Sequence, residues 1–100
     1  VRCLDYIEGN LERSITLEDL MRVSSLGASR LSQLFREHMG TRPLHYVSRR
    51  KMEIAARLLS LEGVSVGDAA ARLGFSSLSY FSRVFKRQTG RPPSSIIAKK

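Results

Sequence analysis

Two stretches of the chain place small polar, amide and cationic side chains at helical spacing i, i+3, i+4 and i+7. The two sets are Ser29, Ser32, Gln33 and Arg36, and, fifty residues later, Ser79, Ser82, Arg83 and Lys86. Serines let a helix backbone approach base edges in the major groove of DNA, where an amide can pair with adenine and a guanidinium with guanine. The cation one turn further on is suitably placed for a phosphate. The two stretches therefore have the chemistry of base recognition, although a single face of this kind is commonly just a solvated helix surface.

Each polar face lies inside a sequence unit that occurs twice in the chain. Thr16 and Ser65 are each followed three residues later by Asp, a pattern typical of a capped helix start. A short helix, a turn and a longer helix follow, and each longer helix ends at a glycine, with a proline three residues beyond. The predicted helices are 16–24 and 28–39 in the first unit, and 65–73 and 78–89 in the second. The duplication favours recognition over a merely solvated face, and each unit is a helix-turn-helix candidate.

Two further helices are predicted outside the paired ones. Apolar spacing indicates a helix over 2–12 and a longer one over 43–61 that connects the units. In the connector, Arg49, Arg50, Lys51 and Arg57 lie mostly off the apolar stripe. Nineteen residues span roughly 28 Å at ~1.5 Å per residue, which is close to the roughly 34 Å that separates recognition helices on one face of B-DNA. A continuous connector would hold the two units at a fixed separation.

Composition and charge narrow the class of partner. The 100 residues carry 17 Lys and Arg against 9 acids, a net charge of +8, and residues 51–100 hold most of the excess. A basic balance of this size favours nucleic acid first and an anionic surface second. No apolar run approaches the roughly 20 residues of a membrane span, and a lone Cys3 gives no disulfide framework. Cys3, His38 and His45 form no dyad or metal-ligand spacing, so we expect no catalysis, metal or cofactor.

Residues 66–96, VGDAAARLGFSSLSYFSRVFKRQTGRPPSSI, resemble the signature of the AraC/XylS transcription regulators. The resemblance extends over about Leu4 to Ile97. It implies an all-α, homeodomain-like fold of seven helices, with two helix-turn-helix subdomains (1–42 and 62–100) joined by a linker helix over 43–61. The sequence departs from the family pattern at Gly27 in place of a capping Ser, at Leu20-Met21, and at Ile96-Ile97 in place of an aromatic-Arg pair, for which Lys99 and Lys100 are candidate substitutes.

The resemblance also assigns roles to residues, by alignment on Phe35 and Phe85. The implied base-reading positions are Ser29, Ser32, Gln33, Leu78, Ser79, Ser82 and Arg83. The predicted phosphate contacts are Arg30, Arg36, Ser77 and Lys86. The function expected is sequence-specific binding of double-stranded DNA in adjacent major grooves, regulating transcription. The alternative is a generic basic module that binds nucleic acid or acidic protein without sequence specificity.

The expected setting is the bacterial cytoplasm, with the protein on the nucleoid when DNA-bound. The full-length protein is expected to contact RNA polymerase. Family members usually carry a separate N-terminal domain for effector sensing or dimerisation, and the start at Val1 favours the interpretation that this domain is absent from the chain.

Overall fold

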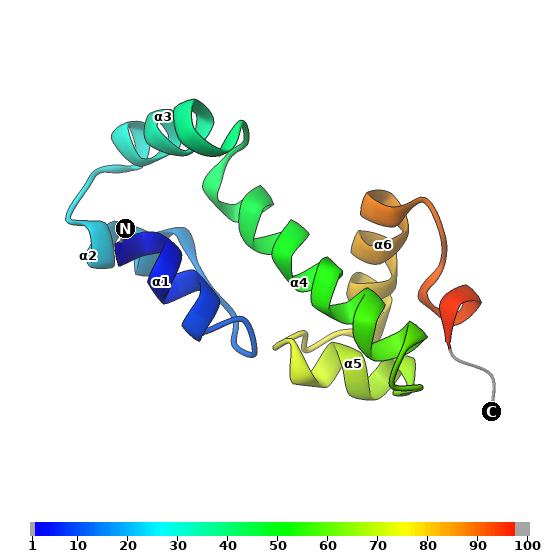
Figure 1. The fold of residues 1–100 in the computed structure, drawn as a ribbon. Coiled ribbons are helices and arrows are strands. Elements are labelled where there is room, and N and C mark those ends of the chain that lie inside the picture. Colours follow the sequence, from blue (N-terminus) through cyan, green and yellow to red (C-terminus); the bar gives the residue numbers. More distant parts are fainter. Residues whose placement is uncertain (1, 98–100) are drawn as a thin grey trace.

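The computed structural model describes residues 2–97, and every regular element among them is helical. In chain order the elements are α1 (Arg2–Gly9), α2 (Leu17–Ser24), α3 (Ala28–Met39), α4 (Pro43–Ser60), α5 (Val66–Arg72), α6 (Leu78–Thr89) and the 3₁₀ helix η1 (Pro93–Ile96). The molecule is elongated, with extents of 46 × 22 × 21 Å. Helix α4 runs diagonally through it, with α1–α3 around its first half and α5, α6 and η1 around its second (Figure 1).

The core is divided into two clusters, one at each end of α4. We call the parts built around them the first lobe (α1–α3 with the start of α4) and the second lobe (α5, α6 and η1 with the rest of α4). The first cluster consists of Cys3, Ile7, Leu11, Ile15, Leu20, Leu31, Phe35 and Val47. The second consists of Met52, Ala55, Leu58, Leu59, Ala69, Ala70, Leu73, Phe81, Val84 and Phe85. Ile54 packs against both clusters, so α4 belongs to both lobes.

Local sequence determines where the paired helices begin. Thr16 and Asp19 form the complete capping box, with the Thr16 hydroxyl accepting from the Asp19 amide at 3.1 Å and the Asp19 carboxylate accepting from the Thr16 amide at 3.0 Å. Ser65 accepts from the Asp68 amide at 3.1 Å, which is the first half of the same motif. Gly27 begins α3 without a side-chain cap, as its missing hydroxyl predicts.

Glycines in the left-handed region follow α3, α5 and α6, whereas α2 ends at Ser25, whose φ is 60°. Gly40 and Gly90 follow α3 and α6 with φ of 72° and 81°, and each donates its amide back to the helix. Gly74, predicted to stop the helix before it, has φ of 79°. The helix over 43–61 is continuous from Pro43 to Ser60, with proline at its first position.

Three expectations need correction. The final element of the predicted seven is a single 3₁₀ turn, so residues 2–97 contain six α-helices. The first helix stops at Gly9, because Asn10 turns the chain by donating its amide to the Ile7 carbonyl and its side chain to the Tyr6 carbonyl. Lys51, placed off the apolar stripe, is buried.

Two further points concern membranes and the C-terminus. Among residues 2–97, no helix is long and apolar enough to cross a membrane. Lys99 and Lys100 lie outside the described residues.

Candidate nucleic-acid interface

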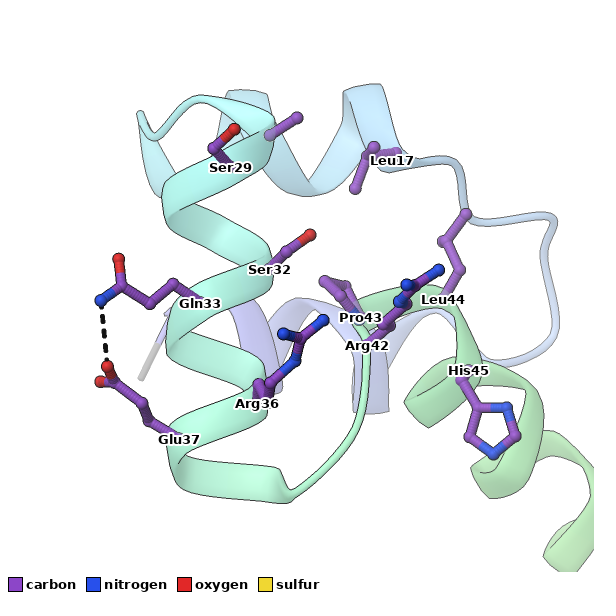
Figure 2. A pocket seen from close by; sticks show the side chains of 11 residues that line it. Leu17, Ser29, Ser32, Gln33, Arg36, Glu37, Arg42, Pro43, Leu44 and His45 are labelled. Atoms are coloured by element: carbon purple, nitrogen blue, oxygen red, sulfur yellow. Dashed lines mark hydrogen bonds between the residues drawn. The ribbon is translucent and has the colours of Figure 1, made fainter.

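One face of helix α3 packs against the core of the first lobe, and the other face carries the residues predicted to contact nucleic acid. Leu31 and Phe35 anchor it, with 2% and 6% of their surface exposed. The predicted positions are exposed except Ser32, which is half-buried. Ser32 and Arg36 point into an open hollow between α3 and the start of α4 (Figure 2), whose volume is 970 Å³. A concave surface that carries arginine and serine side chains beside an exposed helix can receive a nucleic-acid backbone.

The amide of Gln33 is already hydrogen-bonded on both sides. Its Oε1 accepts from Arg30 Nη1 at 3.2 Å, and its Nε2 donates to Glu37 Oε1 at 3.1 Å. In Figure 2, Gln33 and Glu37 extend together along one side of α3. These bonds orient the amide, while a second lone pair on Oε1 and a second N–H on Nε2 remain for pairing with a base. Arg30, predicted as a phosphate contact, therefore also positions a predicted base reader.

Helix α6 repeats the arrangement with different side chains. Ser77 is its N-cap, and its hydroxyl accepts from the Tyr80 amide at 3.2 Å. Leu78 and Ser79 are exposed in the first turn, and Ser82 is half-buried like its counterpart on α3. The Arg83 guanidinium lies 5.8 Å from the centre of the Tyr80 ring, within cation–π range. The ring thus supports a guanidinium that remains exposed.

Residues 20–99 match a family model described as a helix-turn-helix domain. A solved structure of a probable AraC family transcriptional regulator from Rhodopseudomonas palustris CGA009 is 31% identical, with a TM-score of 0.78 over 95% of this chain and 90% of that one. The chain belongs to the AraC family. As an AraC-type helix-turn-helix domain, it is a DNA-binding domain of transcription regulators.

Two other similar proteins are a longer regulator and a domain solved with DNA. The probable transcriptional regulator LumQ of Photobacterium leiognathi is 34% identical over 90 residues, covering 90% of this chain and 36% of LumQ. This AraC-type chain thus spans about a third of that relative. The DNA-binding domain of AdpA, a global transcriptional factor solved in complex with a target DNA, is 26% identical, with a TM-score of 0.86 over 93% of this chain and 84% of that one.

The AraC-type domain brings each predicted set together on its own helix, one set in each lobe. The structure adds three arginines that were not predicted as contacts, with His45 beside them. Arg42 and His45 line the hollow beside α3, and His45, Arg49 and Arg87 line a second groove of 570 Å³ between α4 and α6. For Arg87 the available signal was its place directly after the predicted phosphate contact Lys86, because the repeat puts Glu37 at the equivalent position of α3.

The two helices differ in electrostatics. Within α3, Arg30 and Arg36 are opposed by Glu37, whereas α6 carries Arg83, Lys86 and Arg87 and no acid. The formal charges, with histidine neutral, are therefore +1 and +3. In the described part of the chain no three His, Cys, Asp or Glu side chains gather as a metal site. The chemistry that both helices offer is hydrogen bonding and charge pairing.

Proposed function

We propose that α3 and α6 enter adjacent major grooves on one face of double-stranded DNA, and that their exposed faces recognise different base pairs to regulate transcription. The observation that carries this proposal is the duplicated face. Equivalent positions of two helices are presented with the same pattern of exposure, including the half-buried Ser32 and Ser82. A generic basic module needs charge but no matched pair of polar faces. The AdpA domain was solved in complex with a target DNA, which supports DNA as the partner of this chain.

The proposed roles follow the chemistry of each side chain. Base edges are assigned to Ser29, Ser32, Gln33, Leu78, Ser79, Ser82 and Arg83. Phosphates are assigned to Arg30, Arg36, Ser77 and Lys86, and the hollow beside α3 adds Arg42. Because Gln33 and Arg83 occupy equivalent positions, the first lobe favours adenine where the second favours guanine.

The dimensions of α4 suit this geometry. Its 18 residues span roughly 27 Å at ~1.5 Å per residue. Lobes at its two ends can therefore place recognition helices about one turn of B-DNA apart, roughly 34 Å. The corresponding proposed boundaries are 1–42, 43–61 and 62–100.

The wider role concerns the full-length protein. LumQ is a probable transcriptional regulator, and we propose the same class of activity here, with RNA polymerase contacted by the full-length protein and effector sensing or dimerisation carried by a part outside this chain. Binding chromosomal DNA would place the protein in the bacterial cytoplasm, on the nucleoid. Membership of a family of transcription regulators also favours a function without catalysis.

The test is selection of duplexes from a random pool, followed by binding measurements with the selected duplex, a scrambled duplex and an RNA of equal length. We expect one preferred duplex with two half-sites. Arg83→Ala should lose roughly 1–3 kcal/mol against that duplex and relax the preference at one base pair. Arg72→Ala, which removes an exposed arginine from α5, is the matched control and should leave the preference unchanged. Equal affinity of the unmodified chain for all three nucleic acids would support the generic module instead.

A further inference from the structure

Lys51 is the one charged residue that is buried among those the structure describes, with 6% of its surface exposed. It lies near the middle of α4, where the two lobes meet. Its Nζ donates to the Arg13 carbonyl and to the Leu73 carbonyl, at 2.5 Å each. Arg13 belongs to the turn after α1 in the first lobe, and Leu73 is the C-cap of α5 in the second. One ammonium thus joins both lobes to the helix between them.

The surroundings stabilise the cation in this position. The Phe75 ring centre lies 5.5 Å from Nζ, within cation–π range. The Leu73 carbonyl lies at the C-terminal end of α5, which favours a positive charge. Burial lowers the pKa of Lys51 from its ordinary 10.5, whereas the two carbonyl acceptors and the ring favour the charged form. Among the described residues no carboxylate pairs with Lys51, and backbone oxygens of two lobes hold its ammonium.

The same point is a close backbone contact between the lobes. A Cβ built on Gly74 would lie 2.6 Å from the carbonyl carbon of Arg13 and 2.8 Å from the amide nitrogen of Ser14. Only a residue without Cβ allows the turn after α5 to approach the turn after α1 this closely. Figure 1 shows these two turns side by side beneath α4.

We propose that Lys51 is a positioning residue for DNA recognition, which by binding Arg13 and Leu73 fixes the rotation of the second lobe relative to the first and so sets the half-site spacing. This proposal rests on the proposed function, in which both lobes bind one duplex. Helix α4 alone sets the distance between the lobes. The Lys51 contact adds a second connection between the lobes, because it ties the turn after α1 and the end of α5 to the middle of α4. Two connections resist rotation of one lobe relative to the other better than α4 alone.

Rotation matters because DNA is helical. With 10–10.5 base pairs per turn, one base pair corresponds to roughly 34° of rotation about the duplex axis. A lobe free to rock by such an angle could meet its half-site at a neighbouring spacing. Rigid coupling instead gives the second lobe a high effective concentration at its half-site for one spacing only. At that spacing the two linked lobes bind more tightly than either lobe alone. The expected signature of the Lys51 contact is therefore strict dependence on spacing.

The experiment uses Lys51→Met, which keeps an unbranched apolar side chain as long as the lysine stem and removes the ammonium. Arg57→Met, at an exposed position of the same helix, is the control with the same loss of charge. The probes are the duplex selected by the unmodified chain, versions with one base pair inserted or deleted between the half-sites, and versions with either half-site scrambled. Folding is checked by helical circular dichroism and thermal melting.

We expect the unmodified chain and Arg57→Met to lose about tenfold or more in affinity when the spacing changes by one base pair, as linked sites do when geometry forbids joint binding. Lys51→Met should bind the selected duplex more weakly, and its penalty for altered spacing should fall below about threefold. Its affinity for either single half-site should match the unmodified chain. An unchanged spacing penalty, or an equal loss on single half-sites, would overturn the proposal.

A second pair of variants covers the case in which Lys51→Met does not fold. Gly74→Ala leaves Lys51 in place and forces the two turns apart, whereas Gly90→Ala carries a similar φ, 81° against 79°, with no atom within 4 Å of the new Cβ. Gly74→Ala should lose the spacing penalty and Gly90→Ala should keep it. Equal spacing penalties in the two variants would overturn the proposal. Absence of any preferred duplex for the unmodified chain is a different outcome, because it refutes the proposed function itself.

Discussion

Replacing Gly74 with alanine tests whether the two lobes pack backbone to backbone. Two costs can be worked out from the structure. Alanine in the left-handed region costs roughly 1–2 kcal/mol, and Gly74 has a φ of 79°. The new Cβ would also meet the Arg13 carbonyl carbon at 2.6 Å, against backbone that cannot rotate away. Overpacking of this kind typically costs a further 1–3 kcal/mol or so.

Gly90→Ala isolates the second cost. Gly90 has a φ of 81° and open space around its Cβ position, so the variant carries the left-handed cost alone. The gain from a stiffer unfolded chain is common to both variants and cancels in the difference. Gly74→Ala should therefore be less stable than Gly90→Ala by about 1–3 kcal/mol.

The assay is urea unfolding followed by helical circular dichroism. With a slope of roughly 1–3 kcal/mol per molar urea for a small protein, the midpoint of Gly74→Ala should lie about 1 M below that of Gly90→Ala. Unequal slopes would show that the lobes unfold separately. Midpoints that agree within error would refute the close approach of the two turns.

Three further predictions concern single charged groups. Arg36→Ala should weaken binding to all duplexes alike and flatten the plot of log affinity against log salt by about one unit, measured by titration at several salt concentrations. Glu37→Gln should raise affinity for cognate and scrambled duplexes by about twofold to fivefold at low salt, because a negative charge leaves the DNA-facing helix. The Arg50 guanidinium, at 2.7 and 2.8 Å from the Glu8 carboxylate, holds the pKa of Glu8 below its ordinary 4.5. Glu8→Gln should therefore be less stable than the unmodified chain above pH 4.5, and the difference should disappear as the pH falls through the lower folded-state pKa, as measured by thermal melts across pH.

Much of the fold could be predicted because its signals are local. The capping pair at Thr16, the stop at Gly40 and the proline at the start of the connector each act within one helical turn. The duplication repeats these signals, since Gly90 follows α6 as Gly40 follows α3. The exposed faces of α3 and α6 followed from helical periodicity alone. A single sequence shows such signals directly, because the residues that make them are close neighbours in the chain.

The contact between the lobes could not be predicted in the same way. Lys51 lies between Arg50 and Met52. The sequence does not indicate that backbone carbonyls 38 and 22 positions away accept hydrogen bonds from its ammonium. A lysine is ordinarily exposed unless it is paired, so periodicity placed Lys51 on the solvent side. Gly74 was interpreted as a helix stop, which it is, but its closeness to Arg13 depends on how the lobes meet. Both features arise from tertiary packing.

The charged contacts of Gln33 were missed for a different reason. Arg30, Gln33 and Glu37 are spaced i, i+3 and i+7, so their hydrogen bonds are local and the spacing could have revealed them. The comparison that exposes their importance is with α6, where the position of Glu37 is held by Arg87.

The two lobes therefore share a scaffold and differ where they would touch DNA. The anchors agree, since Phe35 and Phe85 are both buried at the same place in the repeat. The differences lie at the exposed positions. In α3 the Gln33 amide is hydrogen-bonded to the Glu37 carboxylate, whereas the equivalent position of α6 is an arginine with two further cations on the same helix. Charge attracts every duplex alike, whereas an oriented amide discriminates between bases. We accordingly expect the second lobe to supply more of the affinity and of its salt dependence. The first lobe then adds discrimination between base pairs, because a rigid connection through α4 and Lys51 holds this lobe at its half-site for a single spacing.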